Sequence, residues 1–343
     1  MRHMLNTLFV MTPDSFLSLD NQNIVVNCAE KTLGKVPLHT LEQVLYFGYK
    51  GASPALMGEC AKRGIGLSFH SQSGKFLGRI VGKSNGNVLL RKEQYRISDD
   101  LARSCFFARN FITGKIFNSR TIIERMKRDH PLNIDLSAFT AASGELKRLI
   151  SDARKCNSLD ALRGIEGRAA QTYFSVFDMM ILQNREVFHF RGRSRRPAIG
   201  HVNALLSFVY TLLAHDCASA LEGVGLDAYV GFMHRDRPGR VSFALDIMEE
   251  LRSIVADRFV LSLINNREMQ EKDFVCKENG VVLLNENGRK KLLGAWQERK
   301  REQLTHPFLK EKISWGLVPY AQSLLLSRCI RGDLEEYPAF LWK

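Results

Sequence analysis

The sequence predicts an α+β chain in which a small β-sandwich-like domain, residues 1–95, precedes a large helical domain, residues 98–343. Two patterns carry this prediction. Short apolar runs broken by Gly, Asn and Ser fill the first part, whereas apolar residues recur at helical spacing from about 98 to 270. A length of 343 residues also favours two domains over one core.

The first domain is expected to consist mainly of short strands. They are predicted at 5–11, 16–19, 24–27, 67–70 and 76–81. Polar residues suited to turns separate them, as in Asp20-Asn21-Gln22-Asn23. One short helix is expected to interrupt the strands near 54–63.

The second domain is expected to begin with a helix whose N-cap is Ser98, followed by the acids Asp99 and Asp100. The basic residues of this helix form either a solvated face or a surface that follows phosphates: Arg103, Arg109, Lys115, Arg120, Arg125, Lys127 and Arg128. The apolar run 205–214 predicts a buried core helix. The Asn279-Gly280 pair predicts a small hairpin near 274–284, and the residues from 288 onward are expected to be helical.

The charge and cysteine content limit the class of protein. The formal net charge is +13, which favours a polyanionic partner, either nucleic acid or an anionic membrane surface. The seven cysteines are scattered and never form Cys-x-x-Cys, which argues against a disulfide framework or a structural zinc site. We therefore expect a cytoplasmic protein with no signal peptide and no membrane span.

An acidic stripe marks the predicted helix 242–264. Its members fall at helical spacing on one face: Asp246, Glu249, Glu250, Ser253 and Asp257. The preceding Phe243-Ala244-Leu245 leaves little room for solvated charge, so a buried carboxylate here needs a compensating cation. Oxygen ligands suit Mg²⁺ or Mn²⁺. The alternative is an ordinary acidic face exposed to solvent.

Two further polar residues stand in unusual surroundings. His234 follows the apolar Tyr-Val-Gly-Phe-Met and precedes a turn, so it is either a metal ligand or a hydrogen-bonded histidine at the start of a loop. Glu166 is surrounded by glycine and alanine, so it faces either a ligand or a closely packed helix, or ends a helix after a glycine turn.

An arginine-rich segment with interleaved aromatic residues lies between these positions. It contains Arg185, Arg191, Arg193, Arg195 and Arg196, with Phe188 and Phe190 among them. Guanidinium groups form bidentate hydrogen bonds with phosphates and stack on unpaired bases. DNA contact by this segment is therefore favoured over the alternative of a basic surface loop without a partner.

Four blocks in this order resemble the metal-dependent endonuclease-integrase family of CRISPR adaptation, the larger subunit of the spacer-acquisition complex. The blocks are Glu-Gly-Arg-Ala-Ala, Arg-Arg-Pro-Ala with Asn-Ala-Leu-Leu-Ser-Phe-Val-Tyr, Gly-Phe-Met-His, and Ala-Leu-Asp-Ile-Met-Glu-Glu. The resemblance spans nearly the whole chain and is greatest to type I-C members.

The resemblance implies that Glu166, His234 and Glu249 hold Mg²⁺ or Mn²⁺, with Asp246 as a supporting acid or alternative ligand. Asn203 would support the site from behind. The implied chemistry is attack by the 3′-hydroxyl of a short captured duplex on a phosphodiester of the repeat array, or hydrolysis by water. The implied partners are double-stranded DNA, a second copy of the chain joined through the β domain, and a small ferredoxin-like dimeric subunit.

Two other functions stay open on the sequence. One is a catalytically inactive DNA-binding scaffold, in which the acidic cluster only stabilises the fold. The other is a repair nuclease that acts on branched DNA. Loss of cleavage on removing Glu166 or His234, with DNA binding kept, distinguishes an enzyme from a scaffold.

Overall fold

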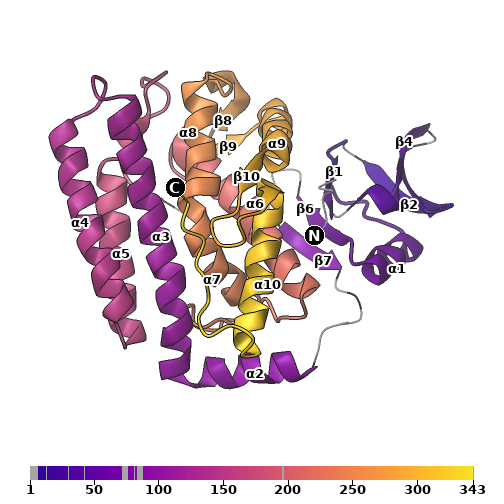
Figure 1. Cartoon of the computed structure of the whole chain (residues 1–343). Helices are drawn as coiled ribbons and strands as arrows, with labels where there is room; N and C mark the ends of the chain where they lie inside the picture. The colour runs from indigo at the N-terminus through magenta and orange to yellow at the C-terminus, as the bar shows by residue number, and fades with distance from the viewer. Residues whose placement is uncertain are drawn as a thin grey trace. The chain divides into compact units, whose positions relative to one another are not determined.

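The computed structural model describes residues 7–342 apart from Pro13, Glu30, Glu42, 72–75, Val81, 83–87, Arg195 and Arg196. The chain forms two compact units. The first comprises Met1–Asn85 with Asn285–Glu302, and the second comprises Gly86–Leu284 with Gln303–Lys343. The elements are labelled in Figure 1.

The first unit contains two small sheets. One has the order β1-β5-β6-β7, with β1, β5 and β6 parallel and β7 antiparallel to β6. The other is an antiparallel meander of β2, β3 and β4. The strands are β1 (Thr7–Val10), β2 (Ser15–Asp20), β3 (Asn23–Cys28), β4 (Lys31–Pro37), β5 (Gln43–Phe47), β6 (Gly66–His70) and β7 (Phe76–Ile80).

The helix expected at 54–63 is α1 (Pro54–Arg63), and it provides the crossover that lets β5 and β6 run parallel. The predicted turn joins β2 to β3, with Asn21 and Gln22 at φ 44° and 66°, the left-handed values that a tight hairpin requires. Leu17, Val44 and Leu56 lie in the buried core of this unit. The pairing of β4 and β5 with their neighbouring strands was not predictable, because the sequences of these two strands lack a clear alternation of apolar and polar residues.

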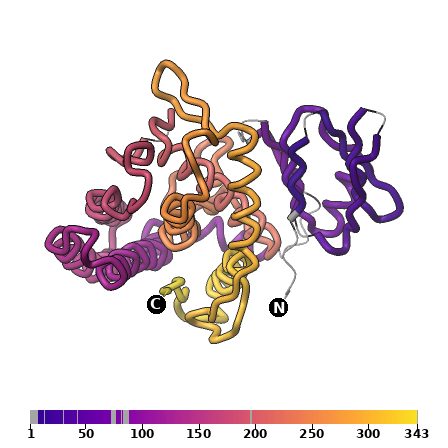
Figure 2. Tube along the Cα trace, turned by 90° about the horizontal axis from the view of Figure 1, so that it is seen from above, coloured from indigo at the N-terminus to yellow at the C-terminus, as the bar shows by residue number. Residues whose placement is uncertain are grey.

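The second unit is mainly helical, which confirms the predicted α+β class. Its helices are α2 (Val88–Asp99), α3 (Leu101–Asp129), α4 (Leu136–Lys155), α5 (Leu159–Ser175), α6 (His201–Gly223), α7 (Ser242–Leu251), α8 (Arg258–Asn265) and α10 (Val318–Ile330). Figures 1 and 2 show α3, α4 and α5 side by side, and α3 also packs along α7. The long helix α3 therefore joins the α4–α5 pair to the rest of the unit.

The boundary between the two units differs from the expected one at residues 95–98. Helix α2 already begins at Val88, inside the range assigned to the β domain. The helix predicted to start at Ser98 starts later, because the N-cap of α3 is Asp100, whose carboxylate accepts the N–H groups of Ala102 and Arg103. The helix α9 (Glu286–Arg301), expected in the helical domain, groups with the first unit.

The predicted core helix and hairpin are both present. Residues 205–214 lie within α6. Among the described residues α6 is the one helix long and apolar enough to cross a membrane, but 56% of its apolar window is buried, as in the core helix of a folded domain. Strands β8 (Phe274–Cys276) and β9 (Val282–Leu284) pair antiparallel around a turn in which Gly280 has φ 76°.

The last part of the chain is only partly helical, contrary to expectation. Strands β10 (Gln303–Thr305) and β11 (Lys312–Ser314) pair before α10, and after α10 come turns and bends at 331–336 and then an irregular tail, 337–342. This tail is held by buried polar groups: Asn118 donates to the Phe340 carbonyl at 2.6 Å and accepts from the Trp342 N–H at 3.0 Å. Pairing with these groups replaces the hydrogen bonds that a helix would make.

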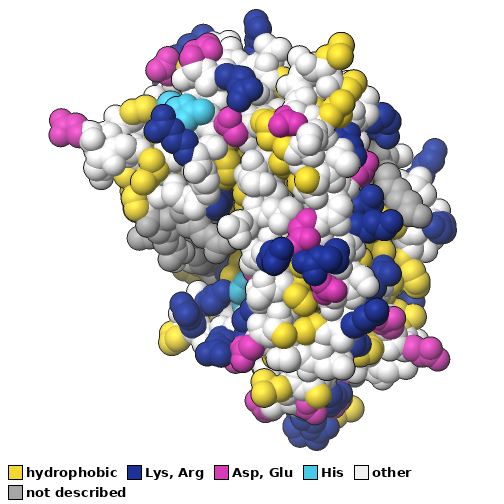
Figure 3. Space-filling view, turned by 90° about the vertical axis from the view of Figure 1, so that its left-hand side faces the viewer, with side chains coloured by type: hydrophobic (Ala, Val, Ile, Leu, Met, Phe, Trp, Pro, Cys, Tyr) yellow, Lys and Arg dark blue, Asp and Glu magenta, His cyan; other side chains and the backbone are white. Residues whose placement is uncertain are grey.

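The face of the second unit on the α4 side carries charges of both signs (Figure 3). Basic and acidic side chains are interspersed over it rather than separated. The ion pairs are local, for example Arg148 with Glu145 at 2.8 Å and with Asp152 at 2.9 Å. A mixed face of this kind is typical of solvated helices.

Candidate metal centre

The wall of the site is one continuous helical segment, 242–265, as the sequence predicted, but it contains a π-helical turn. This turn, η3 (Arg252–Asp257), joins α7 to α8. A π turn adds one residue to a helical turn and therefore changes the direction of the side chains that follow. Such turns often occur at functional sites.

The acidic stripe on this segment is buried, so the alternative of a solvent-exposed acidic face is wrong. Asp246, Glu249 and Glu250 are 0%, 3% and 0% exposed, and Asp257 is 1% exposed. Each carboxylate has its own set of partners, and these sets differ. The stripe is therefore a row of buried carboxyl groups with separate partners rather than one cluster.

Asp246 holds the backbone of the loop that carries His234. Its carboxylate accepts the N–H groups of Phe232, Met233 and His234 at 2.6, 3.0 and 3.0 Å. It also lies 2.6 Å from Nδ1 of the His234 ring. Gly231 allows this approach, because a Cβ there would lie 2.9 Å from the Asp246 carboxylate. With four donors already around it, Asp246 is suited to position the histidine rather than to bind a metal directly.

The contact with Asp246 fixes which ring nitrogen of His234 is available. Because Nδ1 is engaged, Nε2 faces the helix, 3.9 Å from Oε1 of Glu249. The histidine side chain is 20% exposed, whereas that of Glu249 is 4% exposed. A carboxylate behind a histidine in this arrangement is the usual support for a metal-binding imidazole.

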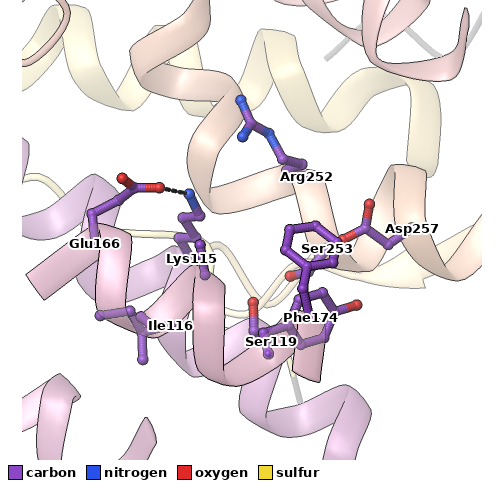
Figure 4. Close-up of a pocket in the computed structure, with 11 residues that line it drawn as sticks. Lys115, Ile116, Ser119, Glu166, Phe174, Arg252, Ser253 and Asp257 are labelled. Carbon is purple, nitrogen blue, oxygen red and sulfur yellow. Dashed lines mark hydrogen bonds and ion pairs between the residues drawn. The ribbon is translucent and has the colours of Figure 1, made fainter. Parts of the chain in front are cut away.

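Glu166 and Glu249 meet at a single cation, the ammonium group of Lys115. Lys115 lies on α3, Glu166 on α5 and Glu249 on α7. The Lys115 Nζ atom forms an ion pair with Oε1 of Glu166, drawn in Figure 4, and lies 2.7 Å from Oε2 of Glu249. Three helices that are distant in sequence therefore bring their charged side chains to one point.

Glu249 is ionised despite its burial. Burial raises the pKa of its carboxyl, but Arg252, Lys115 and His234 outweigh this effect and lower the pKa to about 2. Arg252 donates to Oε1 at 2.6 Å, and its guanidinium lies 5.0 Å from the centre of the Tyr210 ring. The second guanidinium near this ring is that of Arg193, at 5.1 Å. The stacked ring fixes Arg252 and, through it, Glu249.

The donor set fits a divalent cation, although its present spacing does not enclose one. In the described parts of the chain, no group of three His, Cys, Asp or Glu side chains is arranged to hold a metal as it stands. The reason is local, since Lys115 stands between the two carboxylates. Two carboxylates and a supported imidazole are suitable ligands for Mg²⁺ or Mn²⁺ once that cation moves.

Asn203 has a different role from the predicted one. Its Oδ1 accepts from Arg193 at 2.9 Å and from the Ser194 N–H at 3.2 Å, and its Nδ2 donates to the carbonyls of Gly192 and Ile199 at 2.9 and 3.1 Å. All four bonds tie down the 192–199 loop. Asn203 therefore orients the arginine-rich loop and not a metal ligand.

The predicted DNA-contacting arginines are not equivalent. Arg193 points inward, to Asn203, Ser207 and the face of Tyr210, so its guanidinium is already engaged, contrary to the prediction of phosphate contact. Arg185 pairs with Asp178 at 2.9 Å on the surface. Arg191 is exposed. Arg195 and Arg196 lie outside the described residues.

The sequence reasoning missed Lys115 and Arg252 as parts of the site. Lys115 was grouped with the other basic residues of its helix, yet its segment Thr113-Gly114-Lys115-Ile116 is apolar or small on both sides. These apolar and small neighbours were the sequence signal that Lys115 is buried. Arg252 follows Glu249 by three residues on the same helical face, which predicts an ion pair.

Comparisons with known proteins show which family the chain belongs to. The family described as "CRISPR associated protein Cas1" matches residues 8–298 of the chain. The chain belongs to the Cas1 family. The CRISPR-associated endonuclease Cas1 1 of Chlorobaculum tepidum is 45% identical over 343 residues, covering all of both chains. At this identity over its full length, this Cas1 chain is an endonuclease.

Two solved structures share the fold. One, a casposase bound to its integration product, has a TM-score of 0.82 at 21% identity and covers 99% of this chain and 95% of its own. The other, from a Cas6–RT–Cas1–Cas2 complex, has a TM-score of 0.81 at 22% identity and covers 99% of this chain and 36% of its own. At these identities the likeness concerns the architecture of both units.

Proposed function

We propose that this Cas1 chain is a divalent-metal-dependent DNA endonuclease and integrase of CRISPR adaptation. It inserts short captured duplexes into the repeat array by attack of a 3′-hydroxyl on a phosphodiester. The observation that carries the proposal is the meeting of Glu166 and Glu249 at one cation, with the Nε2 atom of His234 facing Glu249. The family membership and the endonuclease relatives support it.

Glu166, His234 and Glu249 would hold Mg²⁺ or Mn²⁺, which supplies charge neutralisation at the phosphodiester and a lower pKa for an attacking hydroxyl or water. The side chains around them perform the positioning. Asp246 keeps the His234 ring turned toward the site, and Arg252 keeps Glu249 in place and ionised. Side chains held in place in this way reduce the rearrangement needed when the substrate binds.

The proposed substrate is double-stranded DNA, both as the captured duplex and as the repeat array. The net charge of +13 supports a polyanionic partner, and the casposase similar to this chain was solved with an integration product. The proposed protein partners are a second copy of the chain, joined through the β-rich unit, and a small ferredoxin-like dimeric subunit. A similar chain lies in a complex with Cas2. We also propose that the protein is cytoplasmic and of type I-C.

The test is strand transfer of a short duplex into a repeat-containing plasmid by Glu166→Gln and His234→Ala variants. We expect both to lose cleavage and strand transfer by more than about 100-fold while still binding DNA. Glu271→Gln and His189→Ala, which change exposed residues of the same types, serve as controls. Metal-dependent activity retained in both site variants would instead support the inactive-scaffold reading of the cluster.

A repair nuclease on branched DNA would use the same residues. Competition between a branched duplex and a repeat-containing plasmid distinguishes the two. We expect insertion at the repeat, and the branched substrate should be cut no faster than a linear duplex. Preference for the branched DNA, with no insertion at the repeat, would favour the repair function.

A further inference from the structure

Lys115 is a buried lysine of the metal centre. The residue is 7% exposed, and its ammonium lies between carboxylates from two other helices. A buried ammonium without partners is strongly unfavourable, and two carboxylates without a cation repel each other. Lys115 therefore stabilises the arrangement of Glu166 and Glu249 in the metal-free chain.

The formal charges around these carboxylates already cancel. The two negative charges of Glu166 and Glu249 are matched by the two positive charges of Lys115 and Arg252. A divalent cation added to this set would leave an excess of positive charge in a poorly hydrated place. Tight metal binding therefore requires that one of the two side-chain cations leaves.

Of the two cations, Lys115 is the one that can move. Arg252 is held by its bond to Glu249 and by the ring of Tyr210. The Lys115 ammonium ends a flexible four-carbon stem, and both of its ion pairs are to the carboxylates that a metal would take.

A cavity next to Lys115 offers the ammonium another position. Its volume is about 30 Å³, enough for a small number of water molecules, and Lys115, Glu166, Ser119 and Ser253 are among its lining residues (Figure 4). The Ser253 hydroxyl is buried there with no hydrogen-bond partner in the described residues. A displaced ammonium thus has both space and a polar group nearby.

We propose that Lys115 is a built-in counter-ion that occupies the space between Glu166 and Glu249 in the metal-free chain and yields it to a divalent cation. The inference rests on the metal site of the proposed function. In this role Lys115 is a positioning residue: it keeps the two carboxylates converged until the metal replaces its ammonium.

The test is Mn²⁺ binding to the full chain by calorimetry, without DNA, for the wild type, Lys115→Met and Lys147→Met. Lys147 is an exposed lysine of α4 and serves as the control. We expect Lys115→Met to bind Mn²⁺ at least about tenfold more tightly than the wild type, because no ammonium competes for the carboxylates. Equal or weaker binding by Lys115→Met would overturn the inference.

Failure of the proposed metal site gives a different result. In that case the wild type itself would show no Mn²⁺ binding that is lost in Glu166→Gln. If the wild type binds Mn²⁺ through Glu166 and Lys115→Met binds no more tightly, the metal site stands and the counter-ion role is excluded.

Thermal melting covers the case in which Lys115→Met folds poorly. In EDTA the variant should melt below the wild type, because Glu166 and Glu249 then lack the cation that they share. Mn²⁺ should raise its melting temperature by more than that of the wild type. Lys115→Arg, which keeps the charge, should respond like the wild type. An equal response of all three proteins to Mn²⁺ would contradict the proposal.

Discussion

The Nδ1 atom of His234 lies 2.6 Å from Oδ1 of Asp246, a carboxylate that is fully buried and also accepts three backbone N–H groups. This contact assigns different roles to the two acids that are three residues apart on α7. Asp246 turns the imidazole, and Glu249 faces the space that the imidazole and Glu166 approach.

Replacing Asp246 with Asn should weaken metal binding without removing a ligand. The amide cannot accept all the bonds that the carboxylate accepts, so the His234 ring loses its fixed orientation. We expect Mn²⁺ affinity to fall by about 10- to 100-fold, as for other substitutions behind a metal-binding histidine. Calorimetry measures this, with Asp236→Asn in the exposed part of the same loop as the control. An unchanged affinity would show that Asp246 only stabilises the loop.

Tyr210 should matter to the site through its ring and to stability through its hydroxyl. The hydroxyl donates to Asp257 at 2.5 Å, and the guanidiniums of Arg193 and Arg252 lie 5.1 and 5.0 Å from the centre of the ring. We expect Tyr210→Phe to lose about 1–3 kcal/mol of unfolding free energy with little change in Mn²⁺ affinity. Tyr210→Leu should also weaken Mn²⁺ binding, because Arg252 no longer holds Glu249. Equal Mn²⁺ affinities for Phe and Leu variants would contradict the role of the ring.

Glu250 should make the protein less stable as the pH rises. Burial raises the pKa of its carboxyl to about 7, more than the bonds from Tyr337, Gln322 and the Phe340 N–H lower it. The pKa of Glu250 in the folded protein lies above the ordinary value of 4.5. The contribution of its protonated carboxyl to the unfolding free energy is therefore complete below pH 4.5 and is lost as the pH rises to about 7.

The Glu250→Gln variant isolates this contribution. The wild-type unfolding free energy, relative to that of the variant, should fall by about 3 kcal/mol between pH 4.5 and pH 7. The pKa of Asp257 is also raised to about 7, mainly by burial, but Asp257 is present in both proteins and its effect cancels. Urea unfolding across this range gives the measurement. Parallel pH profiles for the two proteins would show that Glu250 does not titrate in this range.

Arg191 and Arg193 should differ in their effect on DNA binding. Arg191 is exposed, whereas the Arg193 guanidinium bonds inside the fold. We expect Arg191→Gln to make the slope of log affinity against log salt shallower by about one, and Arg193→Gln to leave the slope nearly unchanged. DNA binding titrated at several salt concentrations tests this. The same change of slope in both variants would show that Arg193 reaches phosphate after all.

Local sequence patterns were sufficient for much of the fold. The turn at Asn21-Gln22, the helix α1 and the β8–β9 hairpin depend on neighbouring residues, and all were predicted. The parallel pairing of β1, β5 and β6 was not predicted, because it depends on contacts between distant segments.

The site was predictable to the extent that polar residues stood in apolar surroundings. Glu166, His234 and the acidic stripe were singled out in this way, whereas the choice of Glu249 as the ligand came from the family resemblance. Lys115 was missed because a lysine on a long amphipathic helix usually lies at the surface, and its burial depends on how α5 and α7 pack against α3. The inward turn of Arg193 likewise depends on Asn203 and Tyr210, which belong to another helix.

Anomalous diffraction from crystals soaked in Mn²⁺ shows whether Glu166, His234 and Glu249 bind one divalent cation. We predict one strong peak bonded to all three side chains, with the Lys115 ammonium withdrawn from between the two carboxylates. No peak at this position, or a peak bonded to Asp246 in place of Glu249, would show that these three side chains do not form the metal site.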